Sequence, residues 1–217
     1  MSHTIRLRPV LAGGRNVSFE LAMKRVMDLG VSACLLGVLA PLLLLVALLV
    51  KTTSKGSVFY TCHWIGHEGR PFKGWKFRTM VQNADVLEDQ LKAQNEMIGP
   101  AFKITNDPRV TPIGRFLRRY SIDELPQLWN VLKGDISLVG PRAPREHEYH
   151  QFTDFQRQKL AVQPGITCLW QVQGRHRIND YDRWVELDLE YIRTWSLWLD
   201  IKILARTALV VIQGSGV

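Results

Sequence analysis

The strongest chemical signal in the sequence is a pair of adjacent carboxylates, Asp123 and Glu124, that lies between two groups of cations. The cations are Arg115, Arg118 and Arg119 before the pair and Lys133, Arg142 and Arg145 after it. A carboxylate can attack phosphorus as a nucleophile, and arginine binds phosphate oxygens through paired hydrogen bonds. These residue types at this spacing indicate chemistry on a phosphorylated substrate.

A purely structural role fits the same residues. Ser121 to Glu124 has the form S-x-x-E of a helix capping box, and the apolar residues that follow it are Leu125, Leu128, Trp129 and Leu132. A helix start of this kind also favours a bound phosphate, so capping and chemistry are compatible. Pro126 weakens a helix begun at Ser121 because it lacks an N–H donor, so we expect an irregular first turn around the acids.

The metal chemistry of the pair depends on the substrate. A pyrophosphate needs a divalent cation and arginines to neutralise the charge that develops as it is cleaved. Mg²⁺ is usually held by one or two carboxylates together with substrate oxygens, and a second carboxylate beside the nucleophile can supply one of them. The sequence contains neither the P-loop pattern G-x-x-x-x-G-K-[ST] nor the dinucleotide-binding pattern G-x-G-x-x-G.

The overall composition indicates an anionic partner. The chain has 217 residues, of which 46% are hydrophobic and 22% charged, which fits one folded domain with an appendage and excludes a disordered chain. Its net charge of +8 and isoelectric point of about 9.6 point to nucleic acid, an acidic membrane surface or phosphorylated substrates. Three widely spaced cysteines without a CxxC motif argue against disulfides or a zinc knuckle and favour a reducing, cytosol-facing location.

An apolar segment precedes the acids. The run from Leu29 to Val50 is 22 residues long and uncharged, which is enough to cross a bilayer as a helix, and no signal-peptide cleavage site follows it. Pro41 removes a backbone hydrogen bond near the middle, so the helix should kink or break there. Basic residues flank both ends, at Arg15, Lys24, Arg25, Lys51 and Lys55. Because positive charge favours the cytoplasmic side, we expect both ends to be cytoplasmic and the segment to form a re-entrant helix-break-helix hairpin.

A small β-hairpin is predicted next. Residues alternate in character over Val58–Ile65, residues 66–69 form a turn, and Pro71–Phe77 is the returning strand. The basic residues near its end fit either a solvated strand edge or a set of phosphate ligands: Lys73, Lys76 and Arg78. An amphipathic surface helix is expected over Val81–Gly99, with its acids Asp85, Glu88 and Asp89 on the solvated face.

Elements on either side of the acids should bring cations to them. Arg115, Arg118 and Arg119 recur at helical spacing on one face. The short strand Ile136–Val139, bracketed by turns, lets the chain bring Arg142 and Arg145 back towards the acids.

The C-terminal third contributes tryptophans. Trp170–Arg177 fits a basic loop that closes over the site, and Trp184, Leu187 and Tyr191 share one face of a predicted helix. Trp195, Trp198 and the segment Ile201–Ile212, which contains Lys202 and Arg206, fit either core packing or short amphipathic helices in the bilayer interface.

Motifs along the chain from about Phe19 onward resemble the bacterial sugar transferase family, the monotopic polyprenol-phosphate phosphoglycosyl transferases. In order they are KRVMDLG, the proline-containing apolar run, KGSVFY, PFKGWKFRTM, DPRVTPIGRFLRRYSIDELPQLWNVLKGDISLVGPR, PGITCLWQVQGR and LDLEYIRTWSLWLDIKIL. The resemblance implies transfer of a sugar phosphate from a UDP-sugar to undecaprenyl phosphate, with release of UMP, as the first membrane step of polysaccharide or glycoconjugate assembly. Larger members carry more membrane spans before this region, and we expect this chain to lack them.

The resemblance also implies roles for residues already singled out. Asp123 would be the nucleophile that forms a phosphosugar intermediate, and Glu124 would bind Mg²⁺. Substrate binding would fall on Lys76, Arg78, Arg115, Arg118, Pro141 and Arg142. The family's Pro-Arg-Pro motif, which is tied to the nucleotide, departs here to Ala143, and the Ser-Pro of the membrane break is Ala40-Pro41.

Together these inferences predict an α+β, mostly helical protein with a flexible tail (1–18), a re-entrant membrane helix broken at Pro41 (19–51) and a catalytic domain (52–217) with a β-hairpin and interfacial C-terminal helices. We expect it at the bacterial inner membrane, with its active site on the cytoplasmic face. Expected partners are a UDP-sugar, undecaprenyl phosphate and membrane lipid but no nucleic acid, and self-association is left open.

Two other functions are compatible with parts of the pattern. A membrane-anchored basic module could bind anionic lipid or nucleic acid, with the acids serving only as a cap. Nucleic-acid binders need cations interleaved with exposed stacking aromatics, whereas here the cations surround acids and the tryptophans group elsewhere. Another Mg²⁺-dependent phosphotransferase or phosphohydrolase is the third candidate.

Overall fold

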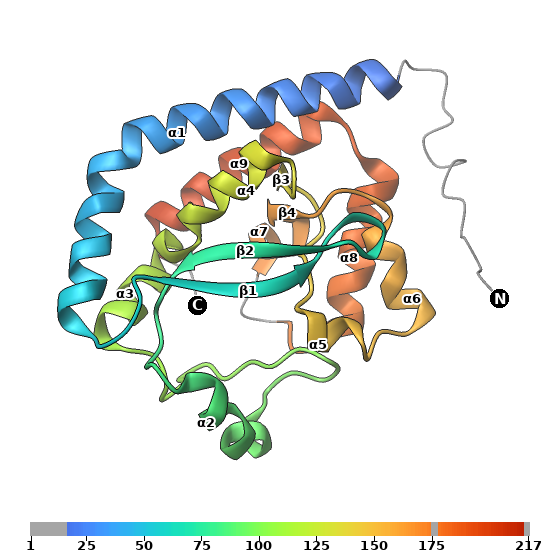
Figure 1. Ribbon diagram of the computed structural model, residues 1–217. Coiled ribbons are helices and arrows are strands. Elements are labelled where there is room, and N and C mark those ends of the chain that lie inside the picture. The colour runs from blue at the N-terminus through green and yellow to red at the C-terminus, as the bar shows by residue number, and fades with distance from the viewer. Residues whose placement is uncertain (1–16, 175–177, 215–217) are drawn as a thin grey trace.

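The computed structural model describes residues 17–174 and 178–214, and these form a mostly helical α+β fold, as predicted. Figure 1 shows the long helix α1 passing over one side of a body that contains the hairpin β1–β2 and the other helices. The α-helices are α1 (Val17–Thr53), α2 (Ala84–Leu91), α3 (Pro112–Arg119), α4 (Leu128–Lys133), α5 (Glu146–Tyr149), α6 (Asp154–Arg157), α7 (Leu169–Gly174), α8 (Tyr181–Thr194) and α9 (Leu197–Ile212). The strands are β1 (Phe59–Ile65), β2 (Pro71–Phe77), β3 (Ser137–Val139) and β4 (Gly165–Thr167). Short 3-10 helices are η1 (His67–Gly69), η2 (Lys92–Gln94), η3 (Ile122–Gln127) and η4 (Gln158–Ala161).

The hairpin has almost the predicted bounds. Strands β1 and β2 are antiparallel, with Phe59 opposite Phe77 and Ile65 opposite Pro71. The turn between them is the 3-10 helix η1, in which Glu68 has a φ of 55°. Strand β2 packs against η3, the element that carries the two acids. The hairpin therefore brings its basic residues to the acids.

Helix α1 differs from the predicted helix-break-helix hairpin. It is one helix of 37 residues that continues through Pro41, and Figure 1 shows it bending rather than breaking. A proline inside a helix removes one hydrogen bond and forces a kink, and the helix can resume on its far side. Among the described residues, α1 is the one helix long and apolar enough to cross a membrane by length and composition, and most of its apolar window is exposed. The predicted tail lies outside the described residues except for Val17 and Ser18, which begin α1.

The first part of α1 is joined to the body by buried polar contacts. Lys24 Nζ lies 2.6 Å from Asp200 Oδ2 on α9 and also donates to a carbonyl of β3. Asp28 Oδ1 accepts a 3.1 Å hydrogen bond from the backbone N–H of Leu138. Arg25 donates to two carbonyls in the last turn of α4, those of Val131 and Leu132, where the helix end carries partial negative charge. The sequence pattern treated Lys24 and Arg25 only as flanking charges, but they fasten α1 to the body.

Two apolar clusters hold the rest together. The larger lies among α4, α7, α8 and the β3–β4 pair, and it includes Trp184, Leu187 and Tyr191, the face predicted for α8. The smaller joins the second part of α1 to β2 and α3, and its buried members are Val46, Val50, Phe77 and Leu117. Both parts of α1 therefore contact the body.

Strands β3 and β4 form a parallel pair that depends on close backbone approach. Gly140 follows β3, and a Cβ on it would lie 2.4 Å from the carbonyl oxygen of Gln163. A Cβ on Gly165 would lie 2.1 Å from the backbone nitrogen of Gly140. Only glycine fits at these positions. The pair fixes the segment that leads directly to Arg142, which forms a β-bridge with Gly165.

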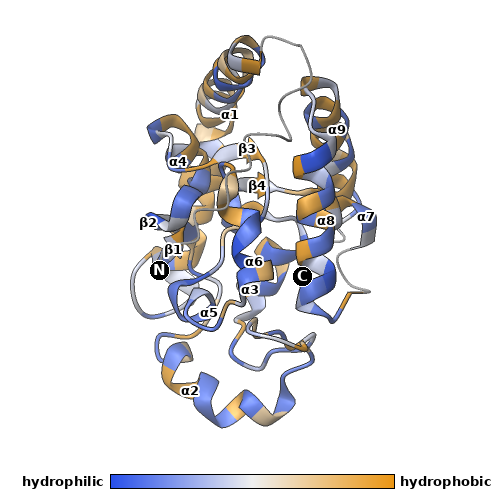
Figure 2. Cartoon of the chain, turned by 90° about the vertical axis from the view of Figure 1, so that its right-hand side faces the viewer, coloured by the Kyte–Doolittle hydropathy of each residue, from blue (hydrophilic) through white to orange (hydrophobic). Residues whose placement is uncertain are grey.

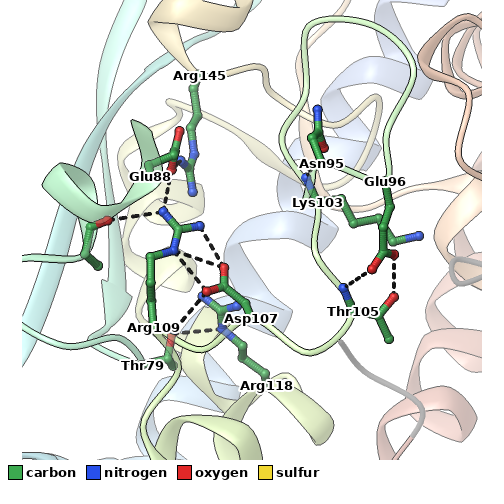
Figure 3. Close-up of polar contacts among 11 residues, drawn as sticks. Thr79, Glu88, Asn95, Glu96, Lys103, Thr105, Asp107, Arg109, Arg118 and Arg145 are labelled. Atoms are coloured by element: carbon green, nitrogen blue, oxygen red, sulfur yellow. Dashed lines mark hydrogen bonds and ion pairs between the residues drawn. The ribbon is translucent and has the colours of Figure 1, made fainter. Parts of the chain in front are cut away.

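The segment between β2 and α3 is less helical than predicted. Helix α2 covers only Ala84–Leu91 of the expected Val81–Gly99, and η2 follows it. The loop then folds on itself, because Glu96 accepts hydrogen bonds from the N–H and the hydroxyl of Thr105 (Figure 3). These local contacts compete with the helix that the periodicity favoured.

Candidate active site

Asp123 and Glu124 line a cavity of about 490 Å³. Its walls come from β1, β2, α2, the loop before α3, α3 itself, η3, the segment after β3, α7 and α8. The basic residues on the walls are Lys76, Arg78, Lys103, Arg109, Arg118, Arg142 and Arg145. The aromatic residues are Tyr60, Trp64, Phe77, Phe102, Trp170 and Trp184. Of the six cations predicted to surround the acids, Arg118, Arg142 and Arg145 line the cavity, whereas Arg115, Arg119 and Lys133 do not.

The acids lie on a sharp corner rather than behind a capping box. Ser121 has a φ of 52°, in the left-handed region, and its side chain makes no capping hydrogen bond. Instead, the N–H of Glu124 donates to the backbone carbonyl of Ser121 over 3.3 Å. The chain must turn as it leaves α3, and the following turns are 3-10, with Pro126 inside them. The predicted irregular first turn is confirmed, and the predicted capping box is wrong.

Asp123 is the more deeply placed of the two acids, since it is only 7% exposed. Glu124 is half-buried and its Oε1 accepts a 2.6 Å hydrogen bond from Lys76 Nζ on β2. The same ammonium lies 5.2 Å from the ring centre of Trp64. Strand β2, which packs against η3, thus supplies a cation to the dyad.

Arg118 faces Asp123 from α3. Its Nε donates a 2.9 Å hydrogen bond to Thr79 Oγ1, which fixes the plane of the guanidinium (Figure 3). Burial lowers the pKa of Arg118 and the negative charges of Asp123 and Asp107 partly offset this. A guanidinium stays protonated at neutral pH even so. Arg118 is therefore a fixed positive charge beside the more buried acid.

Arg142 and Arg145 return towards the acids as predicted. The Arg142 guanidinium lies 5.6 Å from the ring centre of Trp64 and 6.0 Å from that of Trp184. Trp184 in turn stacks on Trp170 of α7, with ring centres 4.2 Å apart. The first residues of the predicted loop Trp170–Arg177 are therefore helical and support the cavity, while residues 175–177 lie outside the described residues.

The opposite wall of the cavity holds an ion network that the sequence pattern did not reveal. Arg109 is 3% exposed and its guanidinium binds both carboxylate oxygens of Asp107 and, at 2.8 Å, Glu88 Oε2 (Figure 3). Arg145 Nη1 approaches the same Glu88 oxygen at 4.0 Å. Burial acts to raise the pKa of Asp107, but the hydrogen bonds from Arg109 outweigh it and lower that pKa. The sequence pattern placed Glu88 on the solvated face of a helix.

The other residues that the resemblance assigned to the substrate take different positions. Arg115 is exposed on α3 and Pro141 is buried behind the cavity, and neither lines it. Ala143 is buried as well. Arg78 lines the cavity, but its guanidinium donates to the backbone at the end of α1. Tyr60, which sequence reasoning did not single out, also lines the cavity, and burial raises its pKa to about 12.

The donor set fits the magnesium ion that the resemblance implies. The described residues contain no cluster of three or more histidine, cysteine or acidic side chains that could enclose a metal. Mg²⁺ is commonly held by one or two carboxylates plus substrate phosphates, so it does not need an all-protein cage. Asp123 and Glu124 offer carboxylates of this kind at the wall of the cavity.

Comparison with known proteins supports the sequence resemblance. A model of the family described as bacterial sugar transferase matches residues 19–214. The chain is 43% identical to the undecaprenyl-phosphate galactose phosphotransferase of Salmonella typhimurium, over 89% of this chain and 41% of that protein. It is 41% identical to the UDP-glucose:undecaprenyl-phosphate glucose-1-phosphate transferase of Klebsiella pneumoniae, over 87% of this chain and 40% of that protein.

A shorter relative is matched over most of its length. The exopolysaccharide production protein ExoY of Sinorhizobium fredii is 42% identical over 85% of this chain and 83% of that protein. The chain thus spans about two fifths of the first two relatives and most of the third. The family model covers nearly every described residue, including both walls of the cavity, and we conclude that the chain belongs to the bacterial sugar transferase family.

Proposed function

We propose that this protein transfers a sugar 1-phosphate from a UDP-sugar to undecaprenyl phosphate and releases UMP. The observation that carries the proposal is the buried Asp123 in a cavity whose walls supply Lys76, Arg118 and Arg142. The names of the relatives, which describe transfer of galactose or glucose phosphate to undecaprenyl phosphate, support the choice of substrates. Because the acids do not cap a helix, a binding module in which they serve only as a cap is disfavoured.

The reaction follows two displacements at one phosphorus atom. A carboxylate oxygen of Asp123 attacks the phosphorus that bears the sugar, the bond to the bridging oxygen breaks, and UMP leaves with that oxygen. A phosphate oxygen of undecaprenyl phosphate then attacks the same phosphorus and displaces the Asp123 carboxylate. The product is a lipid pyrophosphate that carries the sugar, and the enzyme is regenerated without a net proton transfer.

The side chains around Asp123 have distinct tasks in this scheme. Arg118 and Arg142 neutralise the negative charge that accumulates on the phosphoryl oxygens. Lys76 holds Glu124 in place through their 2.6 Å ion pair. Glu124 is the residue that would hold Mg²⁺, which when bound neutralises charge on the substrate pyrophosphate.

The lipid acceptor requires that the cavity lie near a membrane, and α1 fits that requirement. Its early residues contact β3 and α9 and its late residues contact β2 and α3, so both parts meet the same body. Apolar side chains on the rest of α1 are exposed, for example Val38 and Leu44. We propose that α1 enters and leaves the bilayer on one side, the cytoplasmic face of the inner membrane. Contacts at both ends favour this topology over a span that would separate them.

Helix α9 adds a second apolar surface. Trp198, Ile201, Leu209 and Ile212 are exposed on it. Figure 2 shows hydrophobic residues gathered over α1 and α9 at one end of the molecule, and hydrophilic residues around α2 and α5 at the other. Exposed tryptophan with nearby lysine is typical of helices that lie in the bilayer interface. We propose that α9 lies in this interface beside α1.

The direct test is UMP release from UDP-glucose and UDP-galactose with undecaprenyl phosphate and Mg²⁺. Asp123→Asn should abolish release while the protein keeps its fold, because an amide cannot form the phosphosugar bond. Arg183→Gln, at an exposed arginine of α8 outside the cavity, is the matched control and should retain turnover. Radiolabel from the sugar phosphate should remain on acid-quenched wild-type protein and be absent from Asp123→Asn. Undiminished turnover by Asp123→Asn would remove this residue from the nucleophile role.

A further inference from the structure

We propose that Arg78 is a positioning residue that locks the end of α1 to the active site and thereby sets the approach of the lipid acceptor. This inference rests on the proposed function, because it assigns Arg78 to the second displacement. It differs from the role of substrate ligand that the resemblance implies. The structure offers three observations for it.

The first observation is where the guanidinium donates its hydrogen bonds. Arg78 is 7% exposed, and its Nη2 donates to the carbonyl of Ser54 at 2.9 Å, to the hydroxyl of Ser54 at 2.8 Å and to the carbonyl of Val50 at 3.4 Å. Its Nη1 donates to the carbonyl of Lys55. The last carbonyls of a helix lack partners within it and carry partial negative charge. Arg78 therefore caps the C-terminal end of α1 with a positive charge.

The second observation is that the chain after α1 is shaped around this side chain. Gly56 has a φ of +121°, and a Cβ on it would lie 1.9 Å from Nη1 of Arg78. The backbone conformation therefore favours glycine, and a methyl group at this position would displace the end of the Arg78 side chain. Lys51 Nζ also donates to the carbonyl of Gly56, over 3.4 Å. The guanidinium is therefore enclosed by residues 50–56, the end of α1 and the turn after it.

The third observation is that the residues next to Arg78 in the sequence connect the end of α1 to the catalytic groups. Phe77 packs in the apolar cluster that contains Val46 and Val50 of α1. Lys76 binds Glu124, and Thr79 accepts the hydrogen bond from Arg118. Four consecutive residues, 76–79, therefore hold the end of α1 and the catalytic charges in one rigid arrangement.

This arrangement should matter most for the acceptor. A UDP-sugar is soluble and reaches the cavity from the aqueous side, whereas the phosphate of undecaprenyl phosphate is tethered to a chain in the bilayer. The depth and angle of α1 decide where that bilayer surface lies relative to Asp123. A displacement of about 1 Å can cost roughly a hundredfold in rate when it misaligns reacting groups. Loosening the cap at Arg78 should therefore slow the second displacement more than the first.

Direct contact between Arg78 and substrate is the rival explanation. Arg78 lines the cavity, and its Nε is buried without a hydrogen-bond partner among the described residues. A donor of that kind could point at a phosphate. The test must therefore separate a ligand from a positioning residue.

Gly56→Ala distinguishes the two roles, because its methyl group disturbs the contact between Arg78 and the turn after α1 without changing Arg78 itself. We would measure single-turnover UMP release from a UDP-sugar without acceptor, and kcat/KM for undecaprenyl phosphate in nanodiscs. Gly56→Ala and Arg78→Met should each reduce the acceptor kcat/KM about tenfold more than they reduce UMP release. The double variant should be little worse than either single variant, since both disturb the same contact. Lys76→Gln, the comparison on the cavity side, should impair UMP release itself.

The opposite pattern would overturn the proposal. If Arg78→Met reduces UMP release as strongly as acceptor turnover while Gly56→Ala has no effect, then Arg78 is a substrate ligand. An activity-independent readout is trypsin cleavage after Lys51 and Lys55, which should be faster in both variants because the capped segment is released. An unchanged cleavage rate in Arg78→Met would refute the positioning role even if the wild-type protein acts on none of the UDP-sugars tried. Failure of the wild type to release UMP, with faster cleavage in the variants, would refute the proposed function alone.

Discussion

The two walls of the cavity carry similar residues that are arranged in opposite ways. We call the wall formed by α2 and the loop before α3 the outer wall, and the wall formed by α3 and η3 the inner wall. On the outer wall, Arg109 is almost completely buried and is held by Asp107 and Glu88. On the inner wall, Asp123 and Arg118 both line the cavity and lie close enough for their charges to interact. Both walls combine acids with arginines, so residue type alone does not separate them. The difference is that the arginine of the outer wall is ion-paired with two carboxylates, whereas the guanidinium of Arg118 donates to the neutral hydroxyl of Thr79.

This difference indicates separate tasks. An arginine whose donors are taken by two carboxylates has little left to offer a ligand, and its removal leaves buried acids without a counter-ion. A cation that faces a cavity can neutralise charge that arrives with the substrate. We therefore expect the outer wall to determine stability and the inner wall to determine turnover. The comparison can be tested on each wall in turn.

The largest effect should come from the inner wall. Arg118→Gln removes the positive charge beside Asp123, and we expect kcat/KM to fall by about 10²- to 10³-fold, the usual result of losing one charge-stabilising donor. The urea midpoint of unfolding should change less than in a variant that lacks Arg109, because the side-chain hydrogen bond that Arg118 makes among the described residues goes to the neutral Thr79. Turnover close to wild type would show that the inner wall, like the outer one, is structural.

The outer wall should give the reverse result. Arg109→Met leaves Asp107 and Glu88 without their partner, and breaking a buried ion pair in this way costs roughly 3–5 kcal/mol. Urea unfolding followed by tryptophan fluorescence measures this loss, and activity per folded molecule should remain near wild type. Arg70→Met is the matched control, because the Arg70–Glu68 pair is exposed and 3.5 Å apart. Equal destabilisation by the two substitutions would contradict a special role for the outer wall.

The smallest expected effect is a pH dependence of the free energy of unfolding, which would test the structural role of the outer wall. Asp107 has an ordinary pKa of 3.8 that is lowered in the folded protein by Arg109. A depressed carboxyl pKa stabilises the fold above the unfolded pKa, and this contribution is lost as the pH falls through the folded pKa. The stability difference between wild type and Asp107→Asn should therefore be constant near neutral pH and shrink below about pH 4. A difference that grows on acidification would mean that Asp107 is not held as an anion.

Local patterns in the sequence were enough to predict the elements whose causes are local. Alternating residues predicted the first strand of the hairpin to within one residue, and the turn after it predicted Pro71–Phe77 with its observed bounds. The helical spacing of Trp184, Leu187 and Tyr191 identified a buried face. Pro126 correctly indicated an irregular turn at the acids. The cluster of Asp123 with Lys76, Arg118 and Arg142 was also anticipated, partly through the family resemblance.

The failures share a dependence on distant partners. Ser121 lacks its predicted capping role because the exit from α3 forces it into a left-handed conformation. Glu88 is not a solvated residue because Arg109, which follows it by 21 residues, reaches back to it. Lys24 and Asp28 looked like the edge of an apolar run, yet both are buried against the body. No periodicity in a single sequence reports such pairings, since they are decided by tertiary packing.

The ion pair between Lys24 and Asp200 has a consequence for synthesis. The two residues are 176 positions apart, so at roughly 5–20 residues per second the lysine waits about 10–35 s for its partner to be translated. During that interval Lys24 and Asp28 lack their partners on α9 and β3. Under the proposed topology, hydration would keep these charged side chains at the surface of the membrane. The charges of Lys24 and Asp28 would thus keep the beginning of α1 on the side of the membrane where the chain is synthesised. They would do so before the rest of the protein has folded and can bind this part of the helix.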